Sequence, residues 1–411
     1  MKKKIIDLFS GAGGLTEGFR SDKFEIINHI EKDYAASKTL MLRDIFYYLK
    51  HTNNLKYYIS FLSGELSFED LAGYVPPHLF EKTINMEISD DNLNIIFGKI
   101  GDVEDVFGII GGPPCQAYST IGRAQNKSKK NNDVRIYLYR YYIQFLKEYN
   151  PRFFVFENVK GLLSFKDSDG ELLFPKMQEE FRSIGYELDY KLLNMKDYGV
   201  PQSRERIIIF GVPKNDSTLI KDFFDNLEEL KEKPMTIRDV FEDMPKLSSG
   251  QEKNSYSRLC SSTIKKYYRS ISGIPLTQNI SRPNSTRDLE IYKEVAEAKQ
   301  LGYNLKYNEL KESLKTHKHE DKFLDRFKAL SWDGPSHTIV AHISKDGHHY
   351  IHPDVKQNRS ITVREAARIQ GFPDDYYFET SRTQAFIQIG NAVPPILSLK
   401  ISEVIDKMQW K

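Results

Sequence analysis

The stretch KKIIDLFSGAGG, residues 3–14, decides the fold class of this chain. A short run rich in β-branched residues ends at Phe9 and breaks at a glycine turn, and the LTEGFRS that follows has helical character. Such a strand, turn and helix form the first unit of an α/β protein, whose glycines let the backbone approach a ligand closely at the start of the helix. The stretch therefore predicts a ligand-binding βα unit.

The alternation of strand and helix continues through the first half of the chain. FEIINHIE is strand-like and YAASKTLMLRDIF is helical, and the further strand candidates are DVFGIIGG, RFFVFENV, ELDYKLLN and RIIIFGV. Most of these are apolar runs between polar helical segments, which predicts an α/β fold with a mostly parallel sheet covered on both faces.

The regular alternation of predicted strands and helices ends at about residue 235, and this change defines the expected domains. We expect an α/β domain over residues 1–240, with an insertion at 45–98. A smaller, irregular domain is expected at 241–330. Residues 331–411 are expected to form a hairpin that turns at KDG and then C-terminal helices, the last of which returns to the first domain.

Composition describes a globular chain with an uneven charge. The 411 residues are 40% apolar and carry a net charge of +2, with two cysteines and no long uncharged apolar run. We therefore expect no disulfide framework, membrane span or signal peptide, which fits the reducing cytoplasm. Residues 251–330 hold 16 basic and 10 acidic residues, and Ile121–Arg140 holds six and one. Two basic stretches favour a polyanionic partner, although each alone is typical of a solvated face.

The glycine turn has an acidic partner. Glu31 stands twenty residues after Gly11, at the end of the next predicted strand, where a carboxylate can accept both hydroxyls of a ribose. The spacing favours a nucleoside-bearing cofactor over a purely structural turn, and the absence of G-x-G-x-x-G disfavours a dinucleotide. Asp102 in GKIGDVED ends another candidate strand, where it either contacts an adenine amino group or caps a helix.

A cysteine follows two prolines in GGPPCQAYS, residues 111–119. The prolines end the strand and fix the direction of the chain, so Cys115 lies beyond a strand end, where open α/β sheets bind ligands. Glu157 ends the next apolar strand, so both side chains are expected on one rim. A thiolate is a nucleophile, and a neighbouring carboxyl group can donate a proton. Arg204 and Arg206 in QSRERIIIFG add fixed donors.

Each of these residues also has a structural interpretation. A cysteine can be a packed thiol, a glutamate after an apolar run can be a cap, and Arg-x-Arg before a strand can be surface. Their coincidence on one rim favours one site. His342, His348, His349 and His352 predict no metal centre, because they fall on different faces of the expected hairpin and have no cysteine nearby.

Six segments occur in a fixed order between Asp7 and Pro395: DLFSGAGG, GGPPCQAYS, FENV, QSRERIIIFG, TVREAARIQGFP and GNAVPP. In this order they resemble the motifs of the DNA (cytosine-5)-methyltransferases. The resemblance covers nearly the whole chain except 45–98 and 240–330. It implies that residues 1–240 form a Rossmann-like catalytic and cofactor-binding domain dependent on S-adenosylmethionine, with a target-recognition domain at 241–330. GNAVPP departs slightly from the commoner valine-rich version.

The resemblance also implies roles for single residues. Cys115 matches the nucleophile that adds to C6 of cytosine, Glu157 the residue that hydrogen-bonds the ring at N3 and its amino group, and Arg206 a contact to O2, with Arg204 beside it. No residue stands out as the base that removes the C5 proton. S-adenosylmethionine is the implied cofactor and S-adenosylhomocysteine the product. The positions that match its contacts are Phe9, Gly11, Gly13, Gly14, Glu31, Asp102, Pro114, Asn391 and Ala392.

Double-stranded DNA is the implied partner, and its target nucleotide must be flipped out of the helix to be reached. Ile121–Arg140 resembles the family's mobile loop. The residues expected to contact DNA are Arg123, Lys127, Arg135, Arg282, Asn284 and Arg287. The chain is expected to be a monomer, and a cognate restriction endonuclease is a further candidate partner. Two alternatives stay open: a tRNA cytosine-5 methyltransferase of the same fold, and an inactive DNA-binding relative, against which the intact catalytic positions argue.

Overall fold

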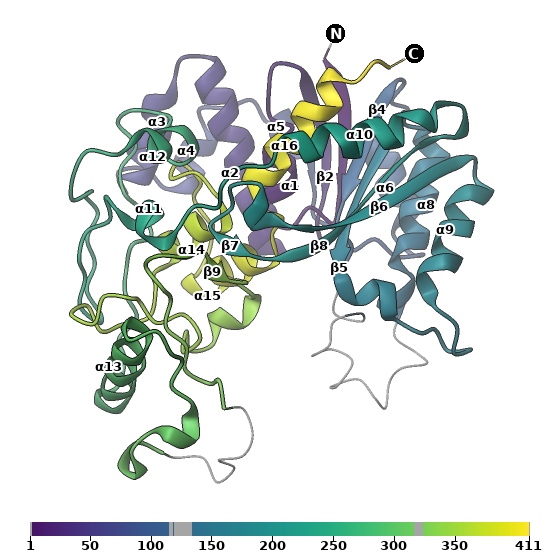
Figure 1. Cartoon of the computed structure of the whole chain (residues 1–411). Helices are drawn as coiled ribbons and strands as arrows, with labels where there is room; N and C mark the ends of the chain where they lie inside the picture. The colour runs from purple at the N-terminus through teal and green to yellow at the C-terminus, as the bar shows by residue number, and fades with distance from the viewer. Residues whose placement is uncertain (1, 115–117, 119–133, 316–323, 411) are drawn as a thin grey trace.

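A seven-stranded sheet forms the centre of the protein (Figure 1). The computed structural model describes residues 2–114, 118, 134–315 and 324–410. The strand order is β3-β2-β1-β4-β5-β8-β6, and β8 runs in the direction opposite to the other six strands. The strands are β1 (Lys3–Leu8), β2 (Phe24–Ile30), β3 (Thr83–Ile84), β4 (Val106–Gly111), β5 (Phe153–Val159), β6 (Tyr186–Asn194) and β8 (Glu205–Pro213). The six predicted strands and the mostly parallel sheet are confirmed.

Helices cover both faces of the sheet because the central strands are apolar on both sides. Successive side chains of a strand point to opposite faces, so Phe153 and Val155 of β5 pack in one core and Phe154 and Phe156 pack in the other. The first core includes side chains of α1 (Gly14–Glu17), α10 (Thr218–Glu229) and α16 (Pro395–Lys407). The second includes α6 (Leu93–Ile100), α8 (Leu138–Tyr149) and α9 (Leu173–Ser183). Within the described ranges, no helix is long and apolar enough to cross a membrane.

The interval 45–98 is only in part an insertion. Helix α2 (Tyr34–His51) continues into it, and α3 (Leu55–Leu62), α4 (Phe68–Ala72) and α5 (His78–Glu81) pack with α2 around a small core of their own. The interval then returns to the sheet, since β3 is its edge strand and α6 covers one face. The predicted insertion is therefore wrong for residues 83–98, which belong with the central sheet.

The second half of the chain is irregular, as predicted, and holds short elements between long loops. These are α11 (Ile237–Phe241), α12 (Ser262–Tyr267), α13 (Thr286–Gln300), α14 (Val363–Gln370), α15 (Arg382–Asn391) and the two-stranded sheet of β7 (Gln202–Ser203) and β9 (Ser336–His337). Helix α13 lies well apart from the central sheet (Figure 1).

The predicted hairpin turning at KDG is wrong. Strand β9 pairs in parallel with the distant β7, and Ala341–Ser344 forms a 3₁₀ turn instead of a strand. The physical reason is competition for the backbone: the buried guanidinium of Arg282 takes the carbonyls of residues 343–345, so these are not free to form a ladder.

Helix α14 joins the irregular region to the sheet domain. The sequence TVREAARIQ predicts an amphipathic helix, but all eight residues of α14 are buried, including its charged ones. Arg368 forms ion pairs with Asp243 at 2.6 Å and Asp374 at 2.5 Å, and Thr362 and Glu365 form a capping box. Buried charges persist only when paired, so these contacts fix the relative positions of the segments that supply them.

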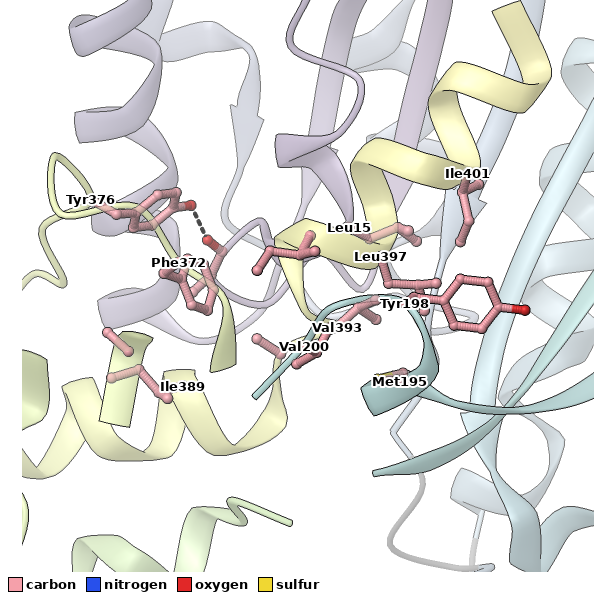
Figure 2. Packing of buried hydrophobic residues seen from close by; sticks show 14 of the residues in the cluster. Leu15, Met195, Tyr198, Val200, Phe372, Tyr376, Ile389, Val393, Leu397 and Ile401 are labelled. Atoms are coloured by element: carbon pink, nitrogen blue, oxygen red, sulfur yellow. Dashed lines mark hydrogen bonds between the residues drawn. The ribbon is translucent and has the colours of Figure 1, made fainter. Parts of the chain in front are cut away.

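The last helix packs against the first. Helix α16 packs on α1 so closely that a Cβ at Gly18 would lie 2.2 Å from the backbone carbonyl of Ser398, and the Ser398 hydroxyl donates to the Leu15 carbonyl. Figure 2 shows Leu15 beside Leu397 and Val393 in this contact. The chain end is therefore part of the wall behind the glycine turn.

Replacing Gly18 by alanine tests this close contact. Its backbone is right-handed helical, so the only penalty is steric overlap with α16, and we expect the free energy of unfolding to fall by about 3 kcal/mol. Gly98 lies in α6 with open space around its Cα, so Gly98→Ala should raise the free energy by about 0.5–1 kcal/mol. Denaturant unfolding measures both, and equal effects of the two substitutions would contradict the packing.

Candidate active site

Three parallel strands and one antiparallel strand bring the predicted residues to one rim. Leu8 at the end of β1 pairs with Gly111 at the end of β4, and Gly111 pairs with Phe156 near the end of β5. Strand β8 runs the other way, so its beginning lies at the same rim, with Arg206 opposite Val159. The glycine turn, the Pro-Pro segment, the FENV acid and the second arginine of QSRER therefore meet there.

Glu157 and Arg206 form an ion pair at this rim. The Arg206 Nε lies 3.0 Å from Glu157 Oε1, and the side chains are 14% and 11% exposed. The other carboxylate oxygen faces Gly112, where an added Cβ would lie 2.9 Å from it. The acid therefore reaches both the arginine and the backbone that leads into the Pro-Pro pair, and a residue larger than glycine at 112 would displace it.

Asn158 holds the Pro-Pro segment against β5. It is fully buried, and its Nδ2 donates to the Pro113 carbonyl at 3.3 Å. Asn158 was not among the predicted site residues, although a polar side chain inside an apolar run is a signal for one. Cys115, Arg123 and Lys127 lie outside the described residues. Asn158 and Gly112 fix residues 112–113, which precede position 115 in the sequence and lie beside Glu157.

The glycine turn has the strained backbone that close approach to a ligand needs. Phe9, Gly11 and Gly13 have φ angles of 54°, 54° and 80°, in the left-handed region that favours glycine. Glu31 Oε2 accepts from the Gly11 N–H at 2.7 Å, and Oε1 accepts from the Asp33 N–H at 2.7 Å. Burial raises the pKa of the Glu31 carboxyl group. The predicted association of Glu31 with the turn is present.

The GNAVPP segment closes the turn from behind. A Cβ at Gly14 would lie 2.1 Å from the Val393 carbonyl oxygen and 3.1 Å from the Ala392 Cβ. Asn391 is exposed at the end of α15, and Ala392 is buried, with its carbonyl accepting from Gln370 Nε2. Residues 391–392, which the sequence places more than 370 residues from the turn, therefore lie beside it.

Asp102 is not at this rim. It is an exposed residue in the loop between α6 and β4, so it precedes the amino end of β4 instead of following a strand end. The glycine turn and Glu31 follow carboxyl ends of parallel strands, which lie at the opposite edge. The residue that does follow the edge strand β3 is Asn85, whose Nδ2 donates to the Glu31 carbonyl at 2.9 Å. It was missed because β3 has only two residues.

Arg204, unlike Arg206, does not contact Glu157. It is 2% exposed, and its guanidinium donates to the carbonyls of Ile339 at 2.8 Å and Gly390 at 3.2 Å. The structure thus separates the two arginines of QSRER: Arg206 faces the acid, and Arg204 supports the backbone just before Asn391. The prediction that places Arg204 in the catalytic group is wrong about its contacts.

The candidate DNA-contacting residues fall into different environments. Arg282 is 8% exposed and donates to the carbonyls of residues 343–345, so its donors support a loop. Asn284 is partly buried and contacts Ser249, whereas Arg287 is exposed in α13. Arg135 lies in the 3₁₀ turn before α8. Both Nη groups of Arg282 donate to loop carbonyls and its Nε is buried, so it is a poor candidate for reading bases.

The histidines do not gather into a ligand set. His348 bonds to the Tyr292 hydroxyl, and His352 is buried against Phe241, where burial lowers its pKa to about 3. Across the described ranges, no group of three or more His, Cys, Asp or Glu side chains is arranged to hold a metal ion.

Comparison with known proteins decides the family. The model of the family described as C-5 cytosine-specific DNA methylase matches residues 78–407. The chain belongs to this family. The type II methyltransferase M.Bpa9945I of Bacillus paralicheniformis is 40% identical, with 98% of each chain covered. M.DdeI of Desulfomicrobium norvegicum is 30% identical, with 98% of this chain and 88% of the relative covered.

Solved structures agree on the fold. A protein described as a DNA modification methyltransferase encoded within an E. coli prophage has a TM-score of 0.63 at 22% identity, with 98% of each chain covered. S. pombe Dnmt2 methyltransferase has a TM-score of 0.52 at 15% identity, with the same coverage. The protein is a DNA (cytosine-5) methyltransferase that methylates cytosine within a specific DNA sequence, as the motifs predict.

Conservative substitution of the two arginines separates their roles in this methyltransferase. Arg206→Lys keeps the charge but loses the planar donor beside Glu157, so we expect kcat to fall by roughly 10- to 100-fold with little change in Tm. Arg204→Lys should instead lower Tm, because the buried carbonyls of Ile339 and Gly390 lose their donors.

Steady-state methyl transfer and thermal melting measure the two effects. If Arg204→Lys lowered kcat as much as Arg206→Lys without loss of Tm, the separation of the two arginines would be refuted.

Proposed function

We propose that the methyltransferase acts through a covalent bond between the Cys115 sulfur and C6 of a cytosine flipped out of duplex DNA. The observation that carries this proposal is the fixed approach to position 115: Asn158 holds the Pro113 carbonyl, and Gly112 lies against the Glu157 carboxylate. A thiolate that follows this segment attacks a ring whose N3 and amino group face Glu157.

Glu157 and Arg206 are proposed to stabilise the charge that develops on the cytosine ring. Formation of the S–C6 bond pushes the ring electrons toward C5, while Glu157 hydrogen-bonds N3 and the amino group and Arg206 donates to O2. S-adenosylmethionine, when bound, supplies an electrophilic methyl group to C5. Transfer of the C5 proton to a base then returns the electrons to the ring, the thiolate leaves C6, and S-adenosylhomocysteine remains as the second product.

The residues around the glycine turn suit S-adenosylmethionine. The positive φ angles at Phe9, Gly11 and Gly13 give a turn that a ligand can approach closely, and Glu31 provides a carboxylate for the ribose hydroxyls. Pro114, Asn391 and Ala392, which match cofactor contacts in the family's motifs, are proposed to line the cofactor site. Asp102 is left out of this group because of its place before β4, and Asn85 takes its place near the adenosine end.

Duplex DNA is proposed to lie across the rim, and the predicted target-recognition domain at 241–330 to read its sequence together with the loop 339–345. Arg204 and Arg282 clamp the two ends of the loop 339–345 through its carbonyls, and that loop exposes Val340, His342 and Lys345. A loop fixed by buried arginines presents its side chains to a partner with little entropic cost. Arg123, Lys127, Arg135, Asn284 and Arg287 stay predicted DNA contacts, and the domain boundaries, monomeric state and cytoplasmic location also stay predictions.

The named relatives support DNA over tRNA as the substrate and a restriction endonuclease as the functional partner. M.Bpa9945I and M.DdeI are both type II methyltransferases. We propose that this chain likewise protects one DNA sequence from a cognate endonuclease.

Methyl transfer from labelled S-adenosylmethionine to duplex DNA or to tRNA tests the substrate, and Cys115→Ser tests the nucleophile. We expect label in DNA only, and a fall to background with the serine variant, because a hydroxyl is far less ionised than a thiol. Cofactor affinity should stay within about twofold, since the sulfur does not hold the cofactor. Transfer to tRNA, or activity retained by Cys115→Ser, would refute the proposal.

The pH dependence of cofactor binding tests the role of Glu31. Since burial raises the pKa of this carboxyl group, it takes up a proton at a higher pH than a free glutamate and then has fewer lone pairs for the ribose hydroxyls. The Kd for S-adenosylmethionine should therefore rise as pH falls through that pKa.

Glu31→Gln removes the titrating group and should bind more weakly, with a smaller pH dependence. Calorimetric titrations between pH 5 and pH 8 measure both proteins. Parallel pH profiles for the wild type and the variant would exclude Glu31 as the titrating contact.

A further inference from the structure

A buried ionic cluster lies beneath the glycine turn. Arg43 of α2 donates from Nε to Glu17 Oε2 at 3.0 Å and from Nη2 to Glu17 Oε1, and from Nη1 to Asp375 Oδ1 at 2.8 Å. These side chains are 3%, 6% and 5% exposed. One guanidinium thus joins the first helix after the turn to a segment more than 350 residues later.

Tyr376 contacts the turn itself. Its hydroxyl donates to the Ala12 carbonyl (Figure 2), and a Cβ at Gly13 would lie 2.9 Å from that hydroxyl oxygen. The Arg43 guanidinium lies over the Tyr376 ring, 4.6 Å from its centroid. The aromatic ring therefore connects the ionic cluster to the backbone between the two glycines.

The segment that bears Asp375 and Tyr376 is itself anchored. The Tyr58 hydroxyl donates to the Asp375 carbonyl at 2.7 Å, and Arg364 Nη2 donates to the Tyr376 carbonyl at 2.8 Å. Each of these side chains is buried. A segment fixed on both sides in this way can hold the turn in one conformation.

The turn needs such support because its conformation is unfavourable by itself. Phe9 has a positive φ, which costs a residue with a Cβ about 1–2 kcal/mol, and the two glycines lose much conformational freedom on being ordered. The Gly11 N–H donates to Glu31 Oε2 at 2.7 Å and the Gly13 N–H donates to the Ser10 carbonyl at 2.9 Å, whereas the Ala12 carbonyl between them is held by Tyr376.

We propose that Tyr376 and Arg43 are positioning residues that hold the glycine turn in its binding conformation before the cofactor arrives. The inference rests on the proposed binding of S-adenosylmethionine at this turn. Both side chains are buried behind the backbone, so they act through the Ala12 carbonyl and Glu17. Their contribution is to cofactor affinity, because preorganisation lowers the cost of binding, and not to the chemical step once the cofactor is bound.

Tyr376→Phe tests the proposal by removing one oxygen atom. We expect the Kd for S-adenosylmethionine, measured by calorimetry without DNA, to rise about fivefold, as the loss of one hydrogen bond implies. The KM for S-adenosylmethionine should rise similarly, with kcat at saturating cofactor within about twofold of the wild type. Tyr268→Phe is the matched control, because the Tyr268 hydroxyl is buried and has no hydrogen-bond partner among the described residues.

Arg43→Lys is the second variant, since it keeps the positive charge but cannot bridge Glu17 and Asp375 in the same way. It should also raise the Kd with kcat preserved. Unchanged Kd values in both variants, or a Tyr268→Phe effect equal to that of Tyr376→Phe, would overturn the inference. A wild-type protein that binds no S-adenosylmethionine would instead overturn the proposed function on which it rests.

Discussion

The antiparallel pairing of β8 with β5 is the constraint on which the site depends. In a wholly parallel sheet, the strand that pairs with β5 on this side would bring its carboxyl end to the ligand rim. Here β8 brings its beginning, so Arg206 lies beside the end of β5 and pairs with Glu157 at 3.0 Å. The same end of β5 supplies Asn158, which holds the Pro113 carbonyl. The pairing of these two strands thus fixes the relative positions of Glu157, Arg206 and the segment that leads to Cys115.

The rest of the rim is assembled from the two ends of the chain. The glycine turn begins at residue 9, and the residues behind it come from 375–376 and 391–398. Buried ion pairs of Arg43 and Arg368 hold these late segments in place. Removing one partner of such a pair would leave an uncompensated charge, so the irregular second half of the chain is structurally coupled to the cofactor turn.

The sequence predicted what depends on local pattern. Apolar runs and glycine turns identified six of the seven strands of the central sheet, and the acid at Glu31 was placed correctly at the turn. The failures came from long-range contacts. Asp102 was assigned to a strand end because the two-residue β3 left no periodic signal. Arg204 and Arg206 look alike in QSRER, and only the backbone carbonyls of Ile339 and Gly390 separate them. The false hairpin had suitable turn residues, but Arg282 binds the carbonyls that it would have needed.

Trapping of the covalent intermediate tests the central claim most directly. In duplex DNA with 5-fluorocytosine at the target position, first located by bisulfite sequencing, the fluorine cannot leave as a proton does, so the enzyme should stay attached after methyl transfer. We predict a DNA adduct that forms only with S-adenosylmethionine, and peptide mass spectrometry should locate it at Cys115. An adduct on another residue, or efficient methylation of ordinary DNA with no adduct on the fluorinated duplex, would contradict the account.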